Sequence, residues 1–406
     1  MTAPERNSEF SFELDALTDD FFEDPFPWYH ELRRRSPVRR CRDGSLMLSR
    51  YADVARVYRQ PETFVSDKRD LFRPRYGDSP LYEHHTTSLV FSDPPYHSRV
   101  RRLLAGALRP AAVRAMTPAL EALVERLLDD VGRRGRFDLI EHFAAAIPVE
   151  VVSNLLRIPL SERQPLRGWS LAILGALEPR LTSRQMAAGN DAVRAFCEYL
   201  RVLIGERRRN LSDDESDVLS CLIRGEGGEK LNEQELLHNC IFILNAGHET
   251  TTNLIGNGVY ELLRNRSELA RLRGNPQRIN GAVEEVLRYQ SPNQLGNRQA
   301  AAATEIGGSA VARGDQIVLM IGAANRDPEH FADPDRFDIE RSPNNHLAFA
   351  SGIHMCIGMS LARLEARIAL GRLFERFPEV RADGPPIRQR RARFRGFLEV
   401  PLAIER

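Results

Sequence analysis

Cysteine is scarce in this sequence. Its five cysteines, at positions 41, 197, 221, 240 and 356, stand far apart and are odd in number. Such spacing gives neither a disulfide framework nor a zinc-binding pattern, and it is typical of a protein from a reducing compartment. The sequence also has no iron–sulfur cysteine run and no glycine-rich flavin or nicotinamide fingerprint. Any reaction that consumes electrons would therefore have to receive them from another protein.

An excess of charge of one sign and long apolar runs are missing as well. With 57 basic and 56 acidic residues, the chain offers no general nucleic-acid-binding surface. Residues 1–24 lack a basic start and lack an apolar run long enough to be a signal peptide or a membrane span. These absences predict a cytoplasmic protein without a nucleic-acid partner or a membrane partner.

The chain of 406 residues contains no linker, low-complexity tract or internal repeat that would divide it. Its length is compatible with two domains or with one large compact domain. Because no boundary is visible, we expect a single domain over residues 1–406.

Helical periodicity dominates the chain, and strand signals are few. Apolar side chains recur at helical spacing over residues 27–35, 52–59, 97–108, 111–133, 186–209 and 233–265. Short strands are predicted at 46–49, 305–306, 310–311, 316–321 and 397–400. Residues 325–341 contain Asp-Pro pairs, which exclude a regular helix. The expected fold is mainly α with a minor β region.

Cys356 stands in the segment Phe-Ala-Ser-Gly-Ile-His-Met-Cys-Ile-Gly, residues 349–358, directly before a helical run. The start of a helix offers free N–H groups and a positive dipole end, and both stabilise a thiolate. Gly352 and Gly358 permit a tight turn and a close approach of the backbone to a flat group. Phe349 is placed to shield the sulfur from water. For an isolated cysteine, a buried structural role in a strand-to-helix loop is the alternative.

This segment resembles, position by position, the haem-ligand signature F-x-x-G-x-H-x-C-x-G of the cytochrome P450 family. The resemblance extends from about residue 24 to residue 404, and residues 325–341 are similar to the meander that precedes the haem loop. It implies the cytochrome P450 fold, haem b as the cofactor and Cys356 as the axial thiolate ligand of the iron. It also implies a monooxygenase that activates dioxygen and hydroxylates, or otherwise oxidises, a small organic molecule.

The predicted helix 233–265 carries polar residues within an apolar stretch, in the run Ala-Gly-His-Glu-Thr-Thr-Thr at residues 246–252. Threonine and glycine each weaken a helix by several tenths to about 1 kcal/mol relative to alanine. A helix that leaves the core for solvent is one explanation. The run is also similar to the P450 pattern A/G-G-x-D/E-T. That resemblance implies that Ala246 and Gly247 leave room for oxygen and substrate, and that Glu249 and Thr250 deliver protons.

Haem carries two propionates, which need cationic or hydrogen-bond-donating side chains at the edge of the macrocycle. His97 and Arg101 lie four residues apart on one predicted helix face, after Asp-Pro-Pro at residues 93–95. By itself this spacing is more typical of a solvated basic face. The stretch is similar to the D-P-P-x-H-x-x-x-R segment of P450s, and the resemblance implies that both residues bind propionates. It implies the same role for Arg298 and for His354.

Glu285 and Arg288 form a Glu-x-x-Arg pair at helical spacing. On a surface helix such a pair contributes roughly 0.2–0.5 kcal/mol. The pair fits the E-x-x-R motif of the same family, whose partners include an arginine of the meander, and Arg336 is the matching candidate. We expect these three residues to support the fold near the haem and to take no part in the chemistry.

Substrate contacts are expected from segments at roughly 66–90, 168–186, 293–297 and 395–398. Gln294 and Leu295 are the first candidates, with Phe397 as a further one. The polar composition of segment 66–90 favours a substrate with oxygens or a carboxylate. His84 and His85 lie in this segment, but no further ligands at metal-binding spacing accompany them, so a solvated loop is favoured.

The resemblance implies a monomeric enzyme that receives electrons from ferredoxin and ferredoxin reductase. Candidates for the docking patch are Arg99, Arg102, Arg109 and Arg363. Two alternatives are a peroxide-driven peroxygenase and a non-catalytic haem-binding or gas-sensing protein. The pair Glu249–Thr250 argues against both, because neither would need to protonate reduced dioxygen.

Overall fold

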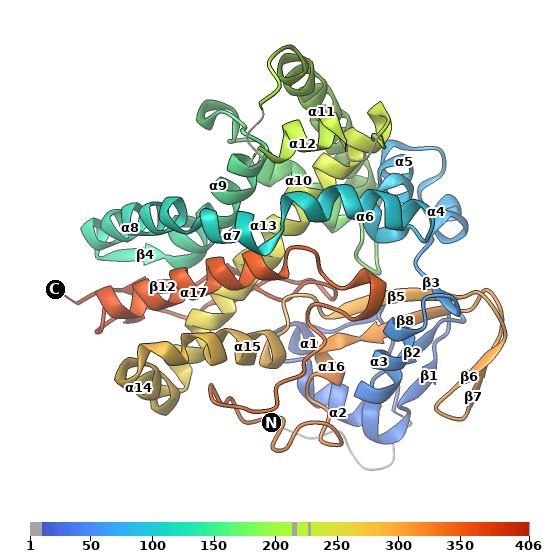
Figure 1. Cartoon of the computed structure of the whole chain (residues 1–406). Coiled ribbons are helices and arrows are strands. Elements are labelled where there is room, and N and C mark those ends of the chain that lie inside the picture. The colour runs from blue at the N-terminus through green and yellow to red at the C-terminus, as the bar shows by residue number, and fades with distance from the viewer. Residues whose placement is uncertain (1–9, 213–216, 226–228, 406) are drawn as a thin grey trace.

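Helices make up most of the computed structural model, which describes residues 10–212, 217–225 and 229–405 (Figure 1). The α-helices are α1 (Asp19–Glu23), α2 (Phe26–Arg35), α3 (Tyr51–Arg59), α4 (Arg69–Tyr76), α5 (Pro80–Thr87), α6 (Tyr96–Ala107), α7 (Pro110–Ala115), α8 (Thr117–Arg134), α9 (Ala146–Leu155), α10 (Leu166–Gly175), α11 (Ser183–Arg209), α12 (Val218–Arg224), α13 (Glu233–Arg264), α14 (Arg266–Gly274), α15 (Ile279–Tyr289), α16 (Ile321–Ala324) and α17 (Met359–Arg376). Shorter helical segments are η1 (Leu89–Phe91), η2 (Ile140–Ala144), η3 (Leu160–Glu162), η4 (Pro276–Arg278) and η5 (Gly352–His354).

The strands pair in small sheets. They are β1 (Val38–Arg40), β2 (Leu46–Leu48), β3 (Phe64–Val65), β4 (Arg136–Asp138), β5 (Leu295–Ala300), β6 (Thr304–Ile306), β7 (Ser309–Val311), β8 (Gln316–Met320), β9 (Arg381–Ala382), β10 (Ile387–Arg388), β11 (Phe397–Glu399) and β12 (Pro401–Ala403). A five-stranded sheet has the order β1-β2-β8-β5-β3, in which β2 and β8 are parallel and the other neighbours are antiparallel. The prediction of a mainly α fold with a minor β region is confirmed.

Helix α13 runs through the middle of the molecule (Figure 1). It starts at a capping box, in which the Asn232 side chain accepts the Glu235 N–H and the Glu235 carboxylate accepts the Asn232 N–H, each over 2.9 Å. The helix packs against α9, α10, α11, α15 and α17. Glu249 and Thr252 are buried in it. The polar run of this helix therefore lies inside the protein, which rules out the explanation that the helix leaves the core for solvent.

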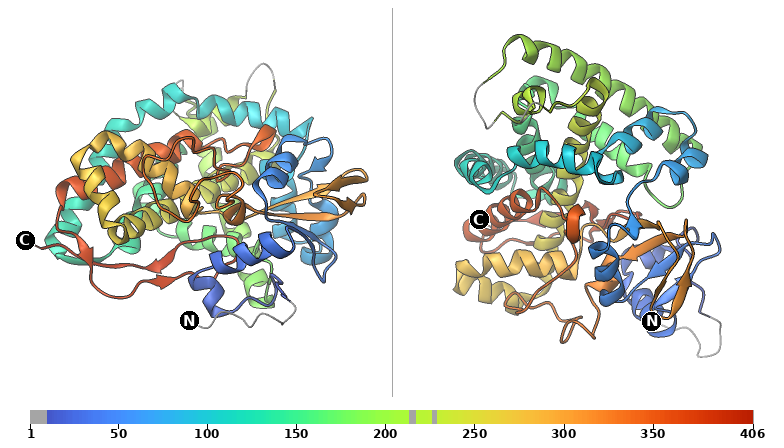
Figure 2. Two further views of the ribbon diagram at one scale, coloured as in Figure 1. Left: turned by 90° about the horizontal axis from the view of Figure 1, so that it is seen from below. Right: turned by 45° about the vertical axis from the view of Figure 1, so that its right-hand side comes forward.

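The helices gather on one side of the molecule, and the five-stranded sheet lies with α2 and α3 on the other (Figure 2). One large apolar core includes side chains of α8, α13 and α17. Separate cores form around the sheet. Among the described residues, no helix is both long enough and apolar enough to cross a membrane.

The predicted helix 111–133 is in fact two helices, α7 and α8. Pro118 lies in the first turn of α8, where a missing N–H costs nothing, so it starts a new helix. The other long predicted helices match α6, α11 and α13 within a few residues. Residues 325–341 form neither a regular helix nor a strand, as predicted.

The expectation of a solvated loop around His84 and His85 is wrong. Segment 66–90 contains α4, α5 and the start of the short helical turn η1. Helix α5 starts at Ser79, whose side chain accepts the Tyr82 N–H. It packs against α11 and α13, and both histidines are buried. Polar composition indicated a loop here, but the polar side chains turn toward the interior.

Candidate active site

An interior cavity of about 360 Å³ lies between α13 and the loop that carries Cys356. Its walls come from α5, η1, α9, α10, the middle of α13, residues 292–298, residues 348–358 and the start of α17. Thr250 lines the cavity from α13, and Cys356 lines it from the loop. Elements far apart in the sequence therefore build one space between these two side chains.

The loop before Cys356 contains backbone turns of uncommon conformation. Ala350 and Gly352 have positive φ angles of 58° and 71°. A Cβ atom at Gly352 would lie 2.3 Å from the carbonyl oxygen of Tyr58, so only glycine fits there. The Cys356 N–H donates to the Phe349 carbonyl over 2.9 Å. Since α17 begins directly after Gly358, Cys356 lies just before the start of a helix.

The Cys356 sulfur is open to the cavity but lies deep within the protein. Burial raises the pKa of the Cys356 thiol, while the Gly358 N–H and the guanidinium groups of Arg101 and Arg363 oppose that rise. These three opposing groups are the ones that stabilise a thiolate. The donor set around the sulfur is thus suited to a metal-bound thiolate.

Phe349 is held at the cavity wall by α17. The Arg363 guanidinium lies over the Phe349 ring, 4.7 Å from its centroid. Arg363 also binds both carboxylate oxygens of Glu284, at 2.7 and 2.8 Å. This arrangement fixes the ring beside the backbone of Cys356.

The middle of α13 leaves space at the cavity and presents a hydroxyl there. The Thr250 hydroxyl donates to the Ala246 carbonyl over 2.8 Å, and both residues line the cavity. A Cβ atom at Gly247 would lie 2.5 Å from Cγ1 of Val152, so glycine allows α13 to approach α9 closely. Ala246 and Gly247 both line the cavity, and their role in leaving room for oxygen and substrate stays a prediction.

The geometry agrees with comparisons to known proteins. The family model described as Cytochrome P450 matches residues 176–398. Cytochrome P450 107B1 of Saccharopolyspora erythraea is 38% identical to this chain over 390 residues, which are 92% of this chain and 93% of the relative. The chain belongs to the cytochrome P450 family. The 6-deoxyerythronolide B hydroxylase of the same organism is a 35% identical P450 over 380 residues, 90% of this chain and 91% of the relative.

Among solved P450 structures, that of P450BioI in complex with hexadec-9Z-enoic acid ligated acyl carrier protein is similar over the whole fold. It has a TM-score of 0.90 at 33% sequence identity, and the match covers 95% of this chain and 100% of that chain. The predicted cytochrome P450 fold is confirmed.

Membership of the P450 family establishes haem b as the cofactor. It also establishes the class of reaction, which is oxidation of a small organic molecule with electrons from a separate redox partner. When bound, haem supplies the activation of dioxygen from which one oxygen atom enters the substrate.

The P450 cavity has an edge suited to the haem propionates. His97, Arg101, Arg298 and His354 all line the cavity, and the ring centroids of His97 and His354 lie 4.2 Å apart. Both ring nitrogens of His97 are buried without a hydrogen-bond partner among the described residues, while Nε2 of His354 lies 3.6 Å from the Asp93 carboxylate. Burial, His354 and Arg101 lower the pKa of His97 to about 4. Unsatisfied buried nitrogens beside two guanidinium groups fit an anionic group, and the propionates are the anions of this cofactor.

Lys68 is a further cation near this edge that the sequence patterns do not reveal. Its ammonium group is buried and has no hydrogen-bond partner in the described part of the chain. Burial and the charge of Arg298 lower the pKa of Lys68 to about 7, against the attraction of Asp93. The rarity of lysine, which occurs only at Lys68 and Lys230, was the one signal available in the sequence.

Glu249 is buried but does not line the cavity. It forms an ion pair with Arg391, which also lies 3.3 Å from Glu178. Burial raises the pKa of Glu249, and Arg391 opposes that rise. Thr250 and Glu249 are neighbours in the helix, yet only the threonine faces the cavity. Arg391 lies in an irregular segment near the C-terminus. Because this segment has no periodic pattern, the sequence did not show that the Arg391 side chain contacts Glu249.

The Glu285–Arg288 pair is fully buried, with side-chain contacts of 2.8 Å. The prediction that the Arg336 side chain joins this pair is wrong. Arg336 is 61% exposed and pairs with Asp338. Arg341 takes the predicted place, since its Nε donates to Glu285 over 3.3 Å. Only the backbone carbonyl of Arg336 is involved, as an acceptor for Arg288.

Of the three predicted substrate contacts, only Leu295 lines the cavity. The prediction for Gln294 is wrong, because its side chain accepts a hydrogen bond from the Tyr29 hydroxyl at 3.1 Å, away from the cavity. The prediction for Phe397 is also wrong, because its ring packs in the core with the Tyr260 ring, 4.7 Å between centroids. Cavity residues that the sequence did not single out include Asn245, Arg393 and Phe394.

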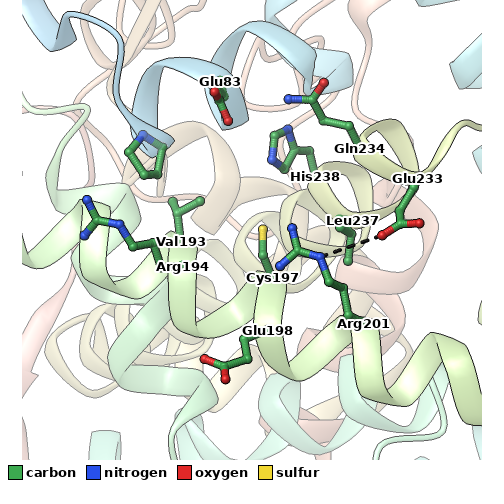
Figure 3. A pocket seen from close by; sticks show the side chains of 11 residues that line it. Glu83, Val193, Arg194, Cys197, Glu198, Arg201, Glu233, Gln234, Leu237 and His238 are labelled. Atoms are coloured by element: carbon green, nitrogen blue, oxygen red, sulfur yellow. Dashed lines mark ion pairs between the residues drawn. The ribbon is translucent and has the colours of Figure 1, made fainter.

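A separate surface groove of about 660 Å³ lies between α5, α11 and α13 (Figure 3). Acidic and basic side chains line it together, and Arg201 lies 3.7 Å from Glu233 across it. Neither Cys356 nor Thr250 lines this groove. The chemistry therefore belongs to the interior cavity.

Proposed function

We propose that this cytochrome P450 oxidises an aliphatic, mainly apolar molecule of natural-product size. The observation that carries the proposal is an apolar wall in the same cavity that Thr250 and Cys356 line. This wall includes Leu89, Phe91, Ile173, Leu174, Phe242 and Ile243. Apolar cavities of this kind bind apolar ligands by removing their surface from water.

The comparisons support this substrate class. One relative is named as the hydroxylase of 6-deoxyerythronolide B, and one comparison structure contains a hexadecenoic acid chain on its carrier protein. The present cavity is compatible with aliphatic substrates of this kind, because it offers apolar contacts from several helices. We carry over the class of molecule alone to this chain.

In the proposed site Cys356 would hold the haem iron through its thiolate, with Phe349 covering the sulfur and the turns at Gly352 and Gly358 positioning it. His97, Arg101, Arg298 and His354 bind the propionates. The support for this role is the buried nitrogens without partners at that edge of the cavity.

Thr250 holds and passes a proton at the cavity wall. Glu249 supplies protons to it from the buried side of α13 that faces away from the cavity. The hydroxyl of Thr250 already donates to Ala246, so it can accept a second hydrogen bond from a group in the cavity. The Glu249 carboxylate has one oxygen without a partner among the described residues, and its ion pair with Arg391 orients it.

Electrons arrive from ferredoxin, which ferredoxin reductase reduces. Of the predicted docking arginines, Arg99, Arg102 and Arg363 form ion pairs within the chain, with Glu235, Glu229 and Glu284 respectively. A ferredoxin would have to compete with these carboxylates, so we expect weak, salt-sensitive docking. A monomeric state and a cytoplasmic location, expected from the sequence, remain part of this proposal.

The test of the proton-transfer role compares Thr250→Ala with Thr252→Ala. Thr252 is the matched control, because its hydroxyl donates to the His248 carbonyl over 3.0 Å and it does not line the cavity. With a surrogate ferredoxin and reductase, Thr250→Ala should release several-fold more hydrogen peroxide per NADH consumed, and Thr250→Ser should restore coupling. A wild-type ratio in Thr250→Ala, or an equal rise in both alanine variants, would overturn this role. Full activity driven by peroxide alone would favour the peroxygenase alternative.

A further inference from the structure

The surface groove between α5, α11 and α13 carries charged groups of both signs that the protein itself uses little (Figure 3). The carboxylates of Glu83 and Glu198 form no ion pair within the described residues. Arg201 lies 3.7 Å from Glu233, and both side chains are more than half exposed, so this ion pair is weak. The groove therefore offers an unpaired carboxylate from α5 and a loosely held guanidinium from α11.

Glu83 and Arg201 lie on opposite sides of the central part of the groove. Figure 3 shows the His238 ring and the Cys197 sulfur between them. Burial raises the pKa of the Cys197 thiol, the positive charge of Arg201 opposes that rise, and the negative charge of Glu83 adds to it. Both charges therefore act on the same point, and a ligand there would meet one negative and one positive group.

His238 presents a nitrogen without a partner to this central part of the groove. The residue is 4% exposed and lines the groove from α13. Its Nδ1 is enclosed by protein, whereas Nε2 is not enclosed and makes no hydrogen bond among the described residues. Burial and Arg201 lower the pKa of His238 to about 4, so the ring is neutral near pH 7. Such a nitrogen is suited to a hydrogen bond with a ligand in the groove.

The mixture of charges selects the kind of ligand. A purely cationic molecule would be repelled by Arg201, and a purely anionic one would be repelled by Glu83. A zwitterion can place its ammonium group against the carboxylate and its own carboxylate against the guanidinium. Pro80, Val193 and Leu237 add apolar contact area for a side chain. A metal ion is not favoured, because no three His, Cys, Asp or Glu side chains in the described part of the chain are arranged to hold one.

Helix α5 forms a wall of both the groove and the interior cavity. The His238 ring on the groove side lies 5.5 Å, between centroids, from the ring of His84, which lines the cavity. The start of α5 is fixed to α11, because the Leu81 N–H donates to the Asn190 side chain over 3.0 Å. A ligand that also joins the middle of α5 to α11 would restrict the motion of the cavity wall.

We propose that the groove is an effector site for a small zwitterion of the amino-acid type with an apolar side chain. The ammonium group binds Glu83, the carboxylate binds Arg201, and His238 forms a hydrogen bond between them. The ligand strengthens binding in the cavity, because it restricts the helix that the two sites share. The site is separate from the P450 cavity and does not depend on the substrate class proposed above.

The first arm of the test measures binding to the groove by calorimetry. The holoenzyme is saturated with phenylimidazole, a ligand of the haem iron, so that the interior cavity is occupied. The probes share one phenylalkyl body: L-phenylalanine is the zwitterion, phenethylamine is the cation and hydrocinnamate is the anion. Wild type should bind L-phenylalanine about tenfold more tightly than it binds either of the other probes.

Variants of the two charged residues assign this binding to the groove. Glu83→Gln should weaken L-phenylalanine binding about tenfold without weakening hydrocinnamate binding, and Arg201→Gln should do so without weakening phenethylamine binding. The control variants are Glu206→Gln and Arg208→Gln, at exposed positions of α11 outside the groove, and they should keep the wild-type affinities. No binding of L-phenylalanine by wild type, equal affinity for all the probes, or the same loss in the control variants overturns the proposal.

The second arm measures the coupling between the groove and the cavity. The Soret band of the holoenzyme is titrated with phenylimidazole, with and without L-phenylalanine at one fixed saturating concentration. In wild type L-phenylalanine should lower the Kd of phenylimidazole several-fold, and in Glu83→Gln the same concentration should leave that Kd nearly unchanged. A Kd that stays constant or rises in wild type overturns the effector role, because L-phenylalanine would then act independently of the cavity or compete for it.

Discussion

Glu285 holds the irregular segment before the haem-ligand loop through several hydrogen bonds. Its oxygens accept from Arg288 at 2.8 Å, from the Asp338 N–H at 2.8 Å and from Arg341 at 3.3 Å. Arg288 in turn donates to the backbone carbonyls of Asn325, Pro334 and Arg336. Because the pair is fully buried, removal of one partner leaves an uncompensated charge in the core, which typically costs about 3–5 kcal/mol.

Arg341→Ala should lower the free energy of unfolding by about 2–4 kcal/mol and reduce the amount of bound haem. The reason is that the Arg341 side chain binds Glu285 and also the carbonyls of Ala332, Asp333 and Arg336. Denaturant unfolding and haem absorbance per protein measure the two effects.

Arg336→Ala is the control for this prediction. The Arg336 side chain is exposed and its ion pair with Asp338 lies at the surface, so the change should stay within about 0.5 kcal/mol. If Arg336→Ala lowered the free energy of unfolding more than Arg341→Ala did, Arg336 and not Arg341 would be the arginine that supports the Glu285–Arg288 pair.

Cys356 and Thr250 could be located from the sequence because the short segments around them resemble P450 motifs, and the structure places both residues at the cavity. Spacing gave no such guide for Arg341, which shares an irregular segment with Arg336. Gln294 and Leu295 are adjacent, and consecutive side chains of extended backbone point to opposite sides, so only one of them reaches the cavity.

Helix α15 packs closely against the irregular segment 325–341 at Gly281. A Cβ atom at Gly281 would lie 2.2 Å from the carbonyl oxygen of Ile339, a backbone atom that cannot move independently. The neighbouring Ile339 N–H is bound to Glu268 over 3.2 Å, which further restricts this segment. The glycine therefore sets the distance between α15 and the chain that leads to the haem loop.

Gly281→Ala should destabilise the protein by about 1–3 kcal/mol through overpacking at this contact. Gly205→Ala in α11 is the matched control, because a Cβ atom there meets no other atom within 4 Å. That change should be neutral or stabilise the helix by up to about 1 kcal/mol. Thermal unfolding of both holoenzymes measures the difference, and a loss in Gly205→Ala equal to that in Gly281→Ala would contradict the close-contact explanation.

Helices could be predicted from the sequence where apolar residues recur at helical spacing over a long stretch of the chain. Helix α13 was predicted within one residue at its end, and α6 and α11 within a few residues. Helix α5 was missed because its polar side chains face the interior instead of solvent, so hydrophobic periodicity gave no signal. The break between α7 and α8 depends on Pro118, which starts a helix at this position as readily as it interrupts one.

On the scale of the whole molecule, the cavity joins the helical side to the sheet. His97 and Arg101 come from α6, Arg298 comes from β5 in the five-stranded sheet, and His354 comes from the loop before α17 (Figure 1). Periodicity and spacing do not show that these residues meet, because their contacts span most of the chain; only the resemblance to P450 segments implied it. A cofactor that binds all of them would also link the two sides of the fold, since a ligand of the native state stabilises it.

The absorption spectrum of the dithionite-reduced, carbon monoxide-bound protein tests the thiolate site most directly. Wild type should give a strongly red-shifted Soret band, and Cys356→Ser should lose it. Cys41→Ser is the control, because Cys41 lies among the residues packed near the sheet and does not line the cavity; it should keep the wild-type band. A wild-type band typical of histidine ligation, or a red-shifted band that survives in Cys356→Ser, would contradict Cys356 as the haem ligand.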